Sequence, residues 1–234
     1  MSLTTLGSEP QPSLARQFDG TTTPYIGTAT GTTTGTISYV NGKYNQALNI
    51  TNTAGSPATN YLSYTTLNIP SGFTSSMWLN FSTISVADQY FLEMSGSGPA
   101  GIAYAVSLNG TNNIAFRVGD VNNNSLTITS TATIAANQWY HIAVVIDGSS
   151  QILYVNGVLS AGPSTCNTLG LYYFNPRLGG NYVLPRVLVN GTIDDLRIYN
   201  TALTAAQVQS IYTQGGARSE EHTSELQSRF GISY

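Results

Sequence analysis

Short runs of alternating apolar and polar residues recur along this chain between residues 46 and 199. Apolar side chains at every second position place one face of a strand on a core, and Met77, Leu79 and Phe81 follow this spacing. Many short strands separated by turn residues predict an antiparallel sandwich or barrel. The predicted strands are 46–51, 60–65, 74–82, 89–94, 102–108, 113–118, 125–130, 138–146, 150–155 and 192–199.

Two segments predict how these strands connect and layer. Asn156-Gly157 separates two apolar runs, and this dipeptide favours the two-residue hairpin turn in which both central residues take positive φ. Residues 142–146 are apolar at every position, which predicts a strand buried on both faces in the middle of a sheet.

A single short helix is predicted after the last strand. Apolar residues recur at helical spacing between Leu203 and Tyr212, Thr204 is a suitable N-cap, and Gly215-Gly216 is a suitable stop. We expect this helix to lie on the outside of the sandwich and to close one end of it.

Two further segments are predicted as loops. Residues 20–36 are rich in Thr and Gly, and their β-branched residues would at most add a short edge strand. Residues 171–177 place three aromatic residues before Asn175 and Pro176, which is typical of an exposed loop.

The two ends of the chain differ from the rest. Residues 1–13 are polar and contain prolines, so we interpret them as a disordered lead-in, and residues 14–216 as one domain. Residues 217–234 contain three of the five glutamates. The string from 218 to 234 resembles translated sequencing-adapter read-through, so the tail 217–234 is interpreted as non-native or disordered and is left out of the fold and the sites.

Charged residues are scarce, at 8% of the chain, and the formal net charge is −3, whereas about 25% is ordinary. Thr, Ser and Asn, about a third of the residues, supply the hydration. Eight scattered basic residues cannot neutralise a run of phosphates, so nucleic acid is not an expected partner. No apolar stretch approaches the roughly 20 residues of a membrane-spanning helix, so membrane insertion is not expected either.

The compartment is less constrained by the sequence itself. No apolar segment follows a basic start in residues 1–17, so no secretory signal is visible. The single cysteine, Cys166, allows no internal disulfide and says little about the redox environment.

Four groups of residues resemble the laminin-G-like branch of the concanavalin A-like lectin/glucanase superfamily. They are Gly42 to Leu48; Ser75 to Leu79; Gln138 to Val144 together with Leu153 to Gly157; and Gly191 to Asn200 followed by Leu203. The resemblance covers about residues 14–216 and implies an all-β jelly roll of two antiparallel sheets with adjacent terminal strands. One position departs from the family, which usually has an aromatic residue where this chain has Arg16 and Gln17.

The resemblance also implies a metal site. Related domains often hold a structural calcium ion between the first and last strands, and the matching carboxylates are Asp19 and Asp194. Alternation along the predicted strand places Asp194 on the core side with Leu196, where a carboxylate must be satisfied by a cation or by backbone amides. Asp195 would point to the same face of the strand as Arg197 and form a weak contact with it at the surface.

Aromatic and amide side chains in predicted loops are the candidate ligand-binding residues. Sugars stack on aromatic rings and hydrogen-bond to amides, and the candidates are Tyr172, Tyr173, Asn175, Tyr182 and Asn123. The alternative is that these residues are ordinary components of a Tyr-rich and Asn-rich sandwich.

Catalysis is not expected. The superfamily's hydrolases carry a Glu-x-Asp-x-x-Glu strand, which this chain lacks, and adjacent Asp194 and Asp195 would point to opposite faces of their strand. His141 is interpreted as a buried or rim histidine bonded to a neighbouring strand, and Cys166 as a free thiol.

The leading hypothesis is therefore a carbohydrate-binding or adhesive module of a larger extracellular or cell-surface protein, with a glycan or an extracellular protein as partner. The alternatives are a structural or protein-interaction spacer without a small ligand and, as a minor possibility, a glycoside hydrolase with an unfamiliar pair of acids.

Overall fold

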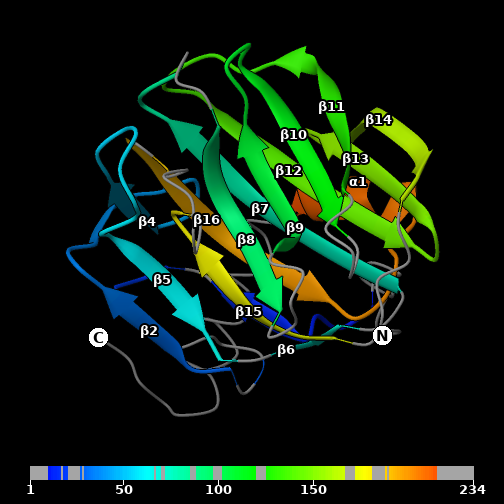
Figure 1. Cartoon of the computed structure of the whole chain (residues 1–234), viewed down its shortest axis with the longest axis horizontal. Helices are drawn as coiled ribbons and strands as arrows, with labels where there is room; N and C mark the ends of the chain where they lie inside the picture. The colour runs from blue at the N-terminus through cyan, green and yellow to red at the C-terminus, as the bar shows by residue number, and fades with distance from the viewer. Residues whose placement is uncertain are drawn as a thin grey trace, which may run out of the picture.

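Two antiparallel sheets lie face to face and form a jelly-roll sandwich, which confirms the predicted fold class (Figure 1). The structure is a computed structural model. It describes residues 10–16, 18–20, 27, 29–65, 67–69, 72–84, 88–96, 102–119, 125–166, 172–180, 188 and 190–214.

The first sheet has the strand order β14-β13-β12-β7-β16-β4-β3, and β1 also pairs with β16. Its strands are β14 (Val158–Thr165), β13 (Ser150–Val155), β12 (Trp139–Asp147), β7 (Gly72–Phe81), β16 (Asn190–Tyr199), β4 (Gln46–Thr51), β3 (Ser38–Asn41) and β1 (Leu14–Arg16).

The second sheet has the order β11-β10-β9-β8-β15-β5-β2, and β6 also pairs with β15. Its strands are β11 (Ser125–Thr133), β10 (Asn113–Gly119), β9 (Ile102–Leu108), β8 (Gln89–Gly96), β15 (Tyr172–Leu178), β5 (Tyr61–Tyr64), β2 (Gly31–Thr34) and β6 (Leu67–Ile69).

Every strand predicted from alternation is present, with ends that differ by a few residues. The Thr-rich segment contributes β2, the edge strand that its β-branched residues allowed. The prediction of a loop over 171–177 was wrong, because residues 172–178 form β15 between β8 and β5. These residues form a strand because they pair with two neighbouring strands. That pairing is a tertiary contact, which local residue propensities do not predict.

The predicted hairpin and the predicted buried strand are both confirmed. Asn156 and Gly157 join β13 to β14 with φ values of 51° and 76°. In β12, alternate residues belong to two apolar clusters: Ile142 and Val144 to the main core between the sheets, and Ala143 and Val145 to a smaller cluster on the outer face of the first sheet.

The helix α1 (Ala205–Gln214) follows β16. Its N-cap is the predicted one: the Gln207 backbone N donates to Thr204 Oγ1 at 3.3 Å, and the Thr204 backbone N donates to Gln207 Oε1 at 2.9 Å. Val208 and Ile211 pack on the outer face of the first sheet. The helix thus lies outside the sandwich, as predicted, but it covers the face of a sheet and does not close one end (Figure 1).

No helix in the described part of the chain is long and apolar enough to cross a membrane. The predicted lead-in begins before the first described residue, and all of the predicted tail 217–234 lies outside the described residues.

Candidate functional site

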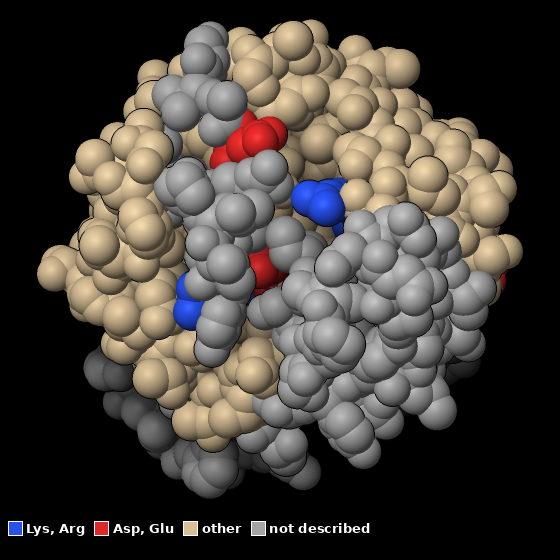
Figure 2. Space-filling model, in the orientation of Figure 1, with Lys and Arg blue, Asp and Glu red and all other residues tan. Residues whose placement is uncertain are grey.

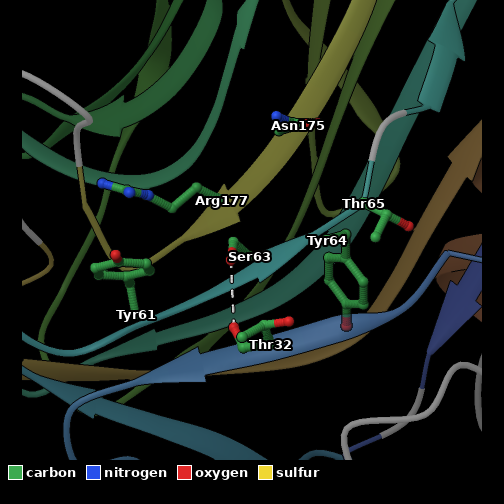
Figure 3. A pocket seen from close by; sticks show the side chains of 7 residues that line it. All are labelled: Thr32, Tyr61, Ser63, Tyr64, Thr65, Asn175 and Arg177. Carbon is green, nitrogen blue, oxygen red and sulfur yellow. Dashed lines mark hydrogen bonds between the residues drawn. The ribbon is translucent and has the colours of Figure 1, made fainter.

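A hollow of about 340 Å³ opens on the second sheet where β2, β5 and β15 lie side by side. Figure 3 shows the side chains around it. Its lining residues are Thr32, Tyr61, Ser63, Tyr64, Thr65, Asn175 and Arg177. The hollow therefore combines hydroxyl groups, an amide, a guanidinium and aromatic rings from three strands that are distant in the sequence.

One wall of the hollow is a stacked pair. The Arg177 guanidinium carbon lies 3.8 Å from the centroid of the Tyr61 ring (Figure 3), which is a cation–π contact. Arg177 is opposite Ser63 of β5 and Glu93 of β8 in the sheet register. β15 is hydrogen-bonded to β5 on one side and to β8 on the other, and this pairing fixes the position of the Arg177 backbone.

Short polar side chains line the rest of the hollow. The Ser63 hydroxyl donates to the Thr32 carbonyl oxygen at 3.3 Å, drawn as the dashed line in Figure 3, and the Thr30 backbone N donates to Thr65 Oγ1 at 2.9 Å. Hydroxyls can both donate and accept hydrogen bonds. The lining therefore suits a ligand that itself carries many hydroxyl groups.

Charged side chains are sparse on this side of the molecule. Figure 2 shows only small, separate groups of acidic and basic side chains among the described residues of the face in view. The described part of this face therefore shows no concentration of positive charge of the kind that polyanions require.

Among the predicted ligand-binding residues whose side chains the structure describes, Asn175 lines the hollow. Tyr172 and Tyr173 lie in β15, but their side chains, and all of Tyr182 and Asn123, fall outside the described residues. Their role stays a prediction.

The sequence analysis missed Tyr61 and Arg177. The available signal was the predicted strand 60–65, in which Tyr61, Ser63 and Thr65 occupy alternate positions that face away from Leu62. What the sequence does not show is that β15 lies next to this strand.

Both predicted metal ligands are bonded to the loop 42–46, which ends in the first residue of β4. The Tyr44 backbone N donates to Asp194 Oδ2 at 2.9 Å, and the Gln46 backbone N donates to Asp19 Oδ1 at 3.1 Å. A Cβ atom at Gly42 would lie 2.7 Å from Asp194 Oδ2, so glycine is what allows this close approach.

Asp194 is fully buried, with 0% of its surface exposed. The pKa of Asp194 is raised to about 7, chiefly by burial and less by the nearby carboxylates of Asp195 and Asp19, against the lowering effect of hydrogen bonds from the Tyr44 and Asp195 backbones. The charged form of Asp194 is therefore costly here unless positive charge is added beside it.

A β-bulge changes the predicted orientation of Asp194. The register places Asp194 opposite Trp78 and Arg197 opposite Ser76, with an irregularity between them, and Asp195 has φ of +45°. Trp78 packs outside the main core, so Asp194 lies on the outer face. The prediction that it lies on the core side with Leu196 was wrong. Strict alternation fails because a bulge adds one residue to the strand.

The predicted surface contact between Asp195 and Arg197 was also wrong. Two hydrogen bonds of 2.9 Å join Arg197 Nε to Asp195 Oδ1 and Arg197 Nη2 to Asp195 Oδ2, and the side chains are 1% and 2% exposed. This is a buried bidentate ion pair in the layer of side chains on the outer face of the first sheet.

His141 lies in the same outer layer and is buried, as predicted. Its ring is 5.4 Å from the Trp78 ring and 5.9 Å from the Tyr212 ring, centroid to centroid. Within the described residues neither ring nitrogen has a hydrogen-bond partner, so the predicted bond from the ring to a neighbouring strand is not found. Burial, with a smaller effect of the Arg197 charge, lowers the pKa of His141 to about 3.

In these environments Asp194 and Asp195 do not form a pair of acids of the kind that glycosidases use. Asp195 has both oxygens bonded to Arg197, and Asp194 is fully buried. The described residues hold no group of three or more His, Cys, Asp or Glu side chains that could bind a metal. Cys166 is a buried free thiol whose pKa is raised by burial, which makes it a poor nucleophile.

Comparisons with solved structures find the same fold. Domain 4 of an extracellular arabinanase from Geobacillus stearothermophilus, solved with arabinotriose, has a TM-score of 0.66 and 23% identity; the match covers 86% of this chain and 98% of that one. The botulinum neurotoxin serotype G binding domain has a TM-score of 0.64 and 17% identity, with 86% and 50% covered. The binding domain of Paraclostridial Mosquitocidal Protein 1 has a TM-score of 0.64 and 16% identity, with 86% and 52% covered.

This chain therefore spans about half the length of the toxin binding domains that it resembles. Comparison of the sequence with curated proteins gives no match. A family model described as the concanavalin A-like lectin/glucanases superfamily matches residues 55–209. With its jelly roll and this match over more than half of its length, the chain belongs to the concanavalin A-like lectin/glucanases superfamily.

Proposed function

We propose that this chain is a non-catalytic carbohydrate-binding module, and that its glycan binds in the hollow between β2, β5 and β15. The observation that carries the proposal is the lining itself, in which hydroxyl and amide groups lie beside the stacked pair of Tyr61 and Arg177. Sugars present apolar C–H faces to flat groups and hydroxyls to polar side chains. The volume of about 340 Å³ is at the lower end of the range for ligand pockets, which favours recognition of one or two sugar units.

We place the module outside the cell, as part of a larger protein. The arabinanase whose domain 4 shares this fold is an extracellular enzyme. Its structure with arabinotriose also supports a glycan as the ligand of a domain of this shape.

We further propose that a calcium ion binds beside Asp19 and Asp194. The residues fit such an ion for a physical reason: a fully buried carboxylate with a pKa near 7 gains from a neighbouring cation. Calcium accepts backbone carbonyl and amide oxygens as well as carboxylates. Bound there, it would tie the loop 42–46 to β16 and would supply structure, not chemistry.

A glycan array tests the proposed function. The full chain would be screened in calcium and in EDTA on an array that includes arabino-oligosaccharides. Saturable binding to one glycan class is expected, and Tyr61→Ala and Asn175→Ala should each weaken it about tenfold or more, which corresponds to at least 1.4 kcal/mol. Thr129→Ala is the matched control, since Thr129 is an exposed residue of β11 at the opposite edge of the same sheet.

The outcome that contradicts the proposal is equally specific. If the folded chain, loaded with calcium, binds no glycan on the array, a protein-interaction or spacer function replaces the lectin-like one. If it binds, but Tyr61→Ala and Thr129→Ala behave alike, the hollow is not the binding site.

A further inference from the structure

A charged side chain without hydrogen bonds lies inside the sandwich. Arg16 is 0% exposed, and its guanidinium nitrogens Nε, Nη1 and Nη2 have no hydrogen-bond partner in the described structure. A buried charge is strongly destabilising unless it is paired and hydrogen-bonded. Something must therefore compensate Arg16 in the folded protein.

The strand register explains why Arg16 points inward. β1 pairs with β16 so that Leu14 is opposite Ile198 and Arg16 is opposite Leu196. Leu14, Leu196 and Ile198 all belong to the main core. Alternation along the strand thus sends the Arg16 side chain to the same side, toward the second sheet. This is also the position where the sequence departs from its family.

A second donor faces Arg16 from the opposite sheet. Tyr64 of β5 is 2% exposed and belongs to the main core, and its hydroxyl likewise has no hydrogen-bond partner among the described residues. Beyond the effect of burial, Tyr64 and Arg16 are each the strongest electrostatic neighbour of the other. The two buried groups thus interact electrostatically, and no hydrogen bond joins them in the described structure.

The remaining neighbours do not neutralise this charge. Tyr39 and Asp19 act on Arg16 more weakly than Tyr64 does, and Asp19 is an exposed residue whose Oδ1 accepts from Gln46. The Phe18 ring, 4.8 Å from the guanidinium carbon, contributes only its π face. The guanidinium offers five N–H donors and no acceptor, and the Tyr64 hydroxyl, which can donate or accept, is neutral and cannot balance the charge.

We propose that Arg16 and Tyr64 form an internal binding site for a small inorganic anion such as chloride, held between the two sheets. An anion accepts hydrogen bonds from both groups and also neutralises the charge of the guanidinium. A water molecule could accept the hydrogen bonds but would leave the charge unbalanced. The site cross-links β1 to β5, so anion binding stabilises the attachment of the first strand. The proposal does not rest on glycan binding in the hollow, although Tyr64 belongs to both sites.

Thermal unfolding at constant ionic strength tests this site. Sodium chloride would replace sodium isethionate, whose anion is too large for a fully buried site. The unfolding temperature of the unaltered chain should rise by about 3–5 °C for each tenfold increase in chloride above its dissociation constant. This response should vanish in Arg16→Met and weaken in Tyr64→Phe, but persist in the matched control Arg117→Met, which removes a partly exposed arginine from β10.

Crystals soaked in sodium bromide give a direct second measurement. An anomalous difference peak within hydrogen-bonding distance of both Arg16 and Tyr64 is expected. A water molecule at this place, or equal chloride responses of the unaltered chain and Arg16→Met, would overturn the proposal. If Arg16→Met does not fold, Tyr64→Phe and the bromide peak decide the question.

Discussion

The Arg197 guanidinium donates two parallel hydrogen bonds of 2.9 Å to the Asp195 carboxylate, with both side chains buried on the outer face of the first sheet. The pair sits immediately after Asp194 at the bulge in β16. The bulge thus places two different carboxylates side by side. Asp195 is paired with Arg197, whereas Asp194 accepts hydrogen bonds from backbone N–H groups.

Removing one partner of this pair should be costly. We expect Asp195→Ala to lower the free energy of unfolding by about 3–5 kcal/mol, because it leaves the Arg197 charge buried without its main acceptor. Urea denaturation measures this change. The double variant Asp195→Ala/Arg197→Met should lose less stability than the single one, and a single-variant loss of under about 1 kcal/mol would indicate an ordinary surface pair.

Asp194 and His141 should have opposite effects on the pH dependence of stability. The folded state keeps a proton on Asp194 up to pH about 7, whereas the unfolded state loses it near pH 3.9, so this group lowers stability as pH rises between these values. His141 takes up a proton near pH 6.5 when unfolded but only near pH 3 when folded. It therefore lowers stability as pH falls through that range, and the two effects cancel between about pH 4 and 6.5.

Single substitutions should reveal each slope. In Asp194→Asn only the histidine effect remains, so the free energy of unfolding should rise with pH by up to about 1.4 kcal/mol per unit between pH 4 and 6.5. In His141→Phe it should fall with pH over the same range. Urea titrations at half-unit pH steps measure both, and parallel profiles for the two variants would contradict these assignments.

Calcium should stabilise the chain more at pH 8 than at pH 5.5, since the ion binds the ionised form of Asp194. At one hundred times the dissociation constant we expect the unfolding temperature at pH 8 to rise by about 5 °C or more. Asp194→Asn should abolish this rise and Asp19→Asn should reduce it. Asp147→Asn is the control, because Asp147 is an exposed acid at the end of β12; a calcium response that survives Asp194→Asn would argue against the site.

The turn between β13 and β14 should be sensitive to a single methyl group. Gly157 has φ of +76°, and a Cβ atom there would lie 2.5 Å from Gln209 Oε1 and 3.0 Å from Tyr212 Cδ1 of α1. Gly157→Ala should therefore destabilise the chain by more than about 1 kcal/mol.

Gly148→Ala is the matched comparison for this turn. Gly148 also has positive φ, at +60°, but a Cβ atom there would meet no other atom within 4 Å, so only the backbone cost applies. Chemical denaturation of both variants separates the two contributions. Equal losses would show that α1 moves aside at no cost.

Local patterns were sufficient for most of the secondary structure. Period-two alternation predicted the strands, because one buried face is enough to fix their spacing. Asn156-Gly157 predicted its hairpin and Thr204 its helix cap, because φ preferences and capping bonds involve residues close in sequence. The family resemblance, carried by motifs such as the one ending in Asn200, was likewise present in the sequence.

The sites depended on contacts between distant segments. Pairing of β15 with β5 brings Arg177 onto Tyr61 across more than a hundred residues, and no local signal reports that pairing. The bulge turned Asp194 away from the side that alternation predicted, since one extra residue reverses the faces of everything on one side of it. Arg16 faces Tyr64 only because two sheets stack. The order of residues thus determined the elements and the fold class, while burial, register and the packing of separate strands decided which side chains meet.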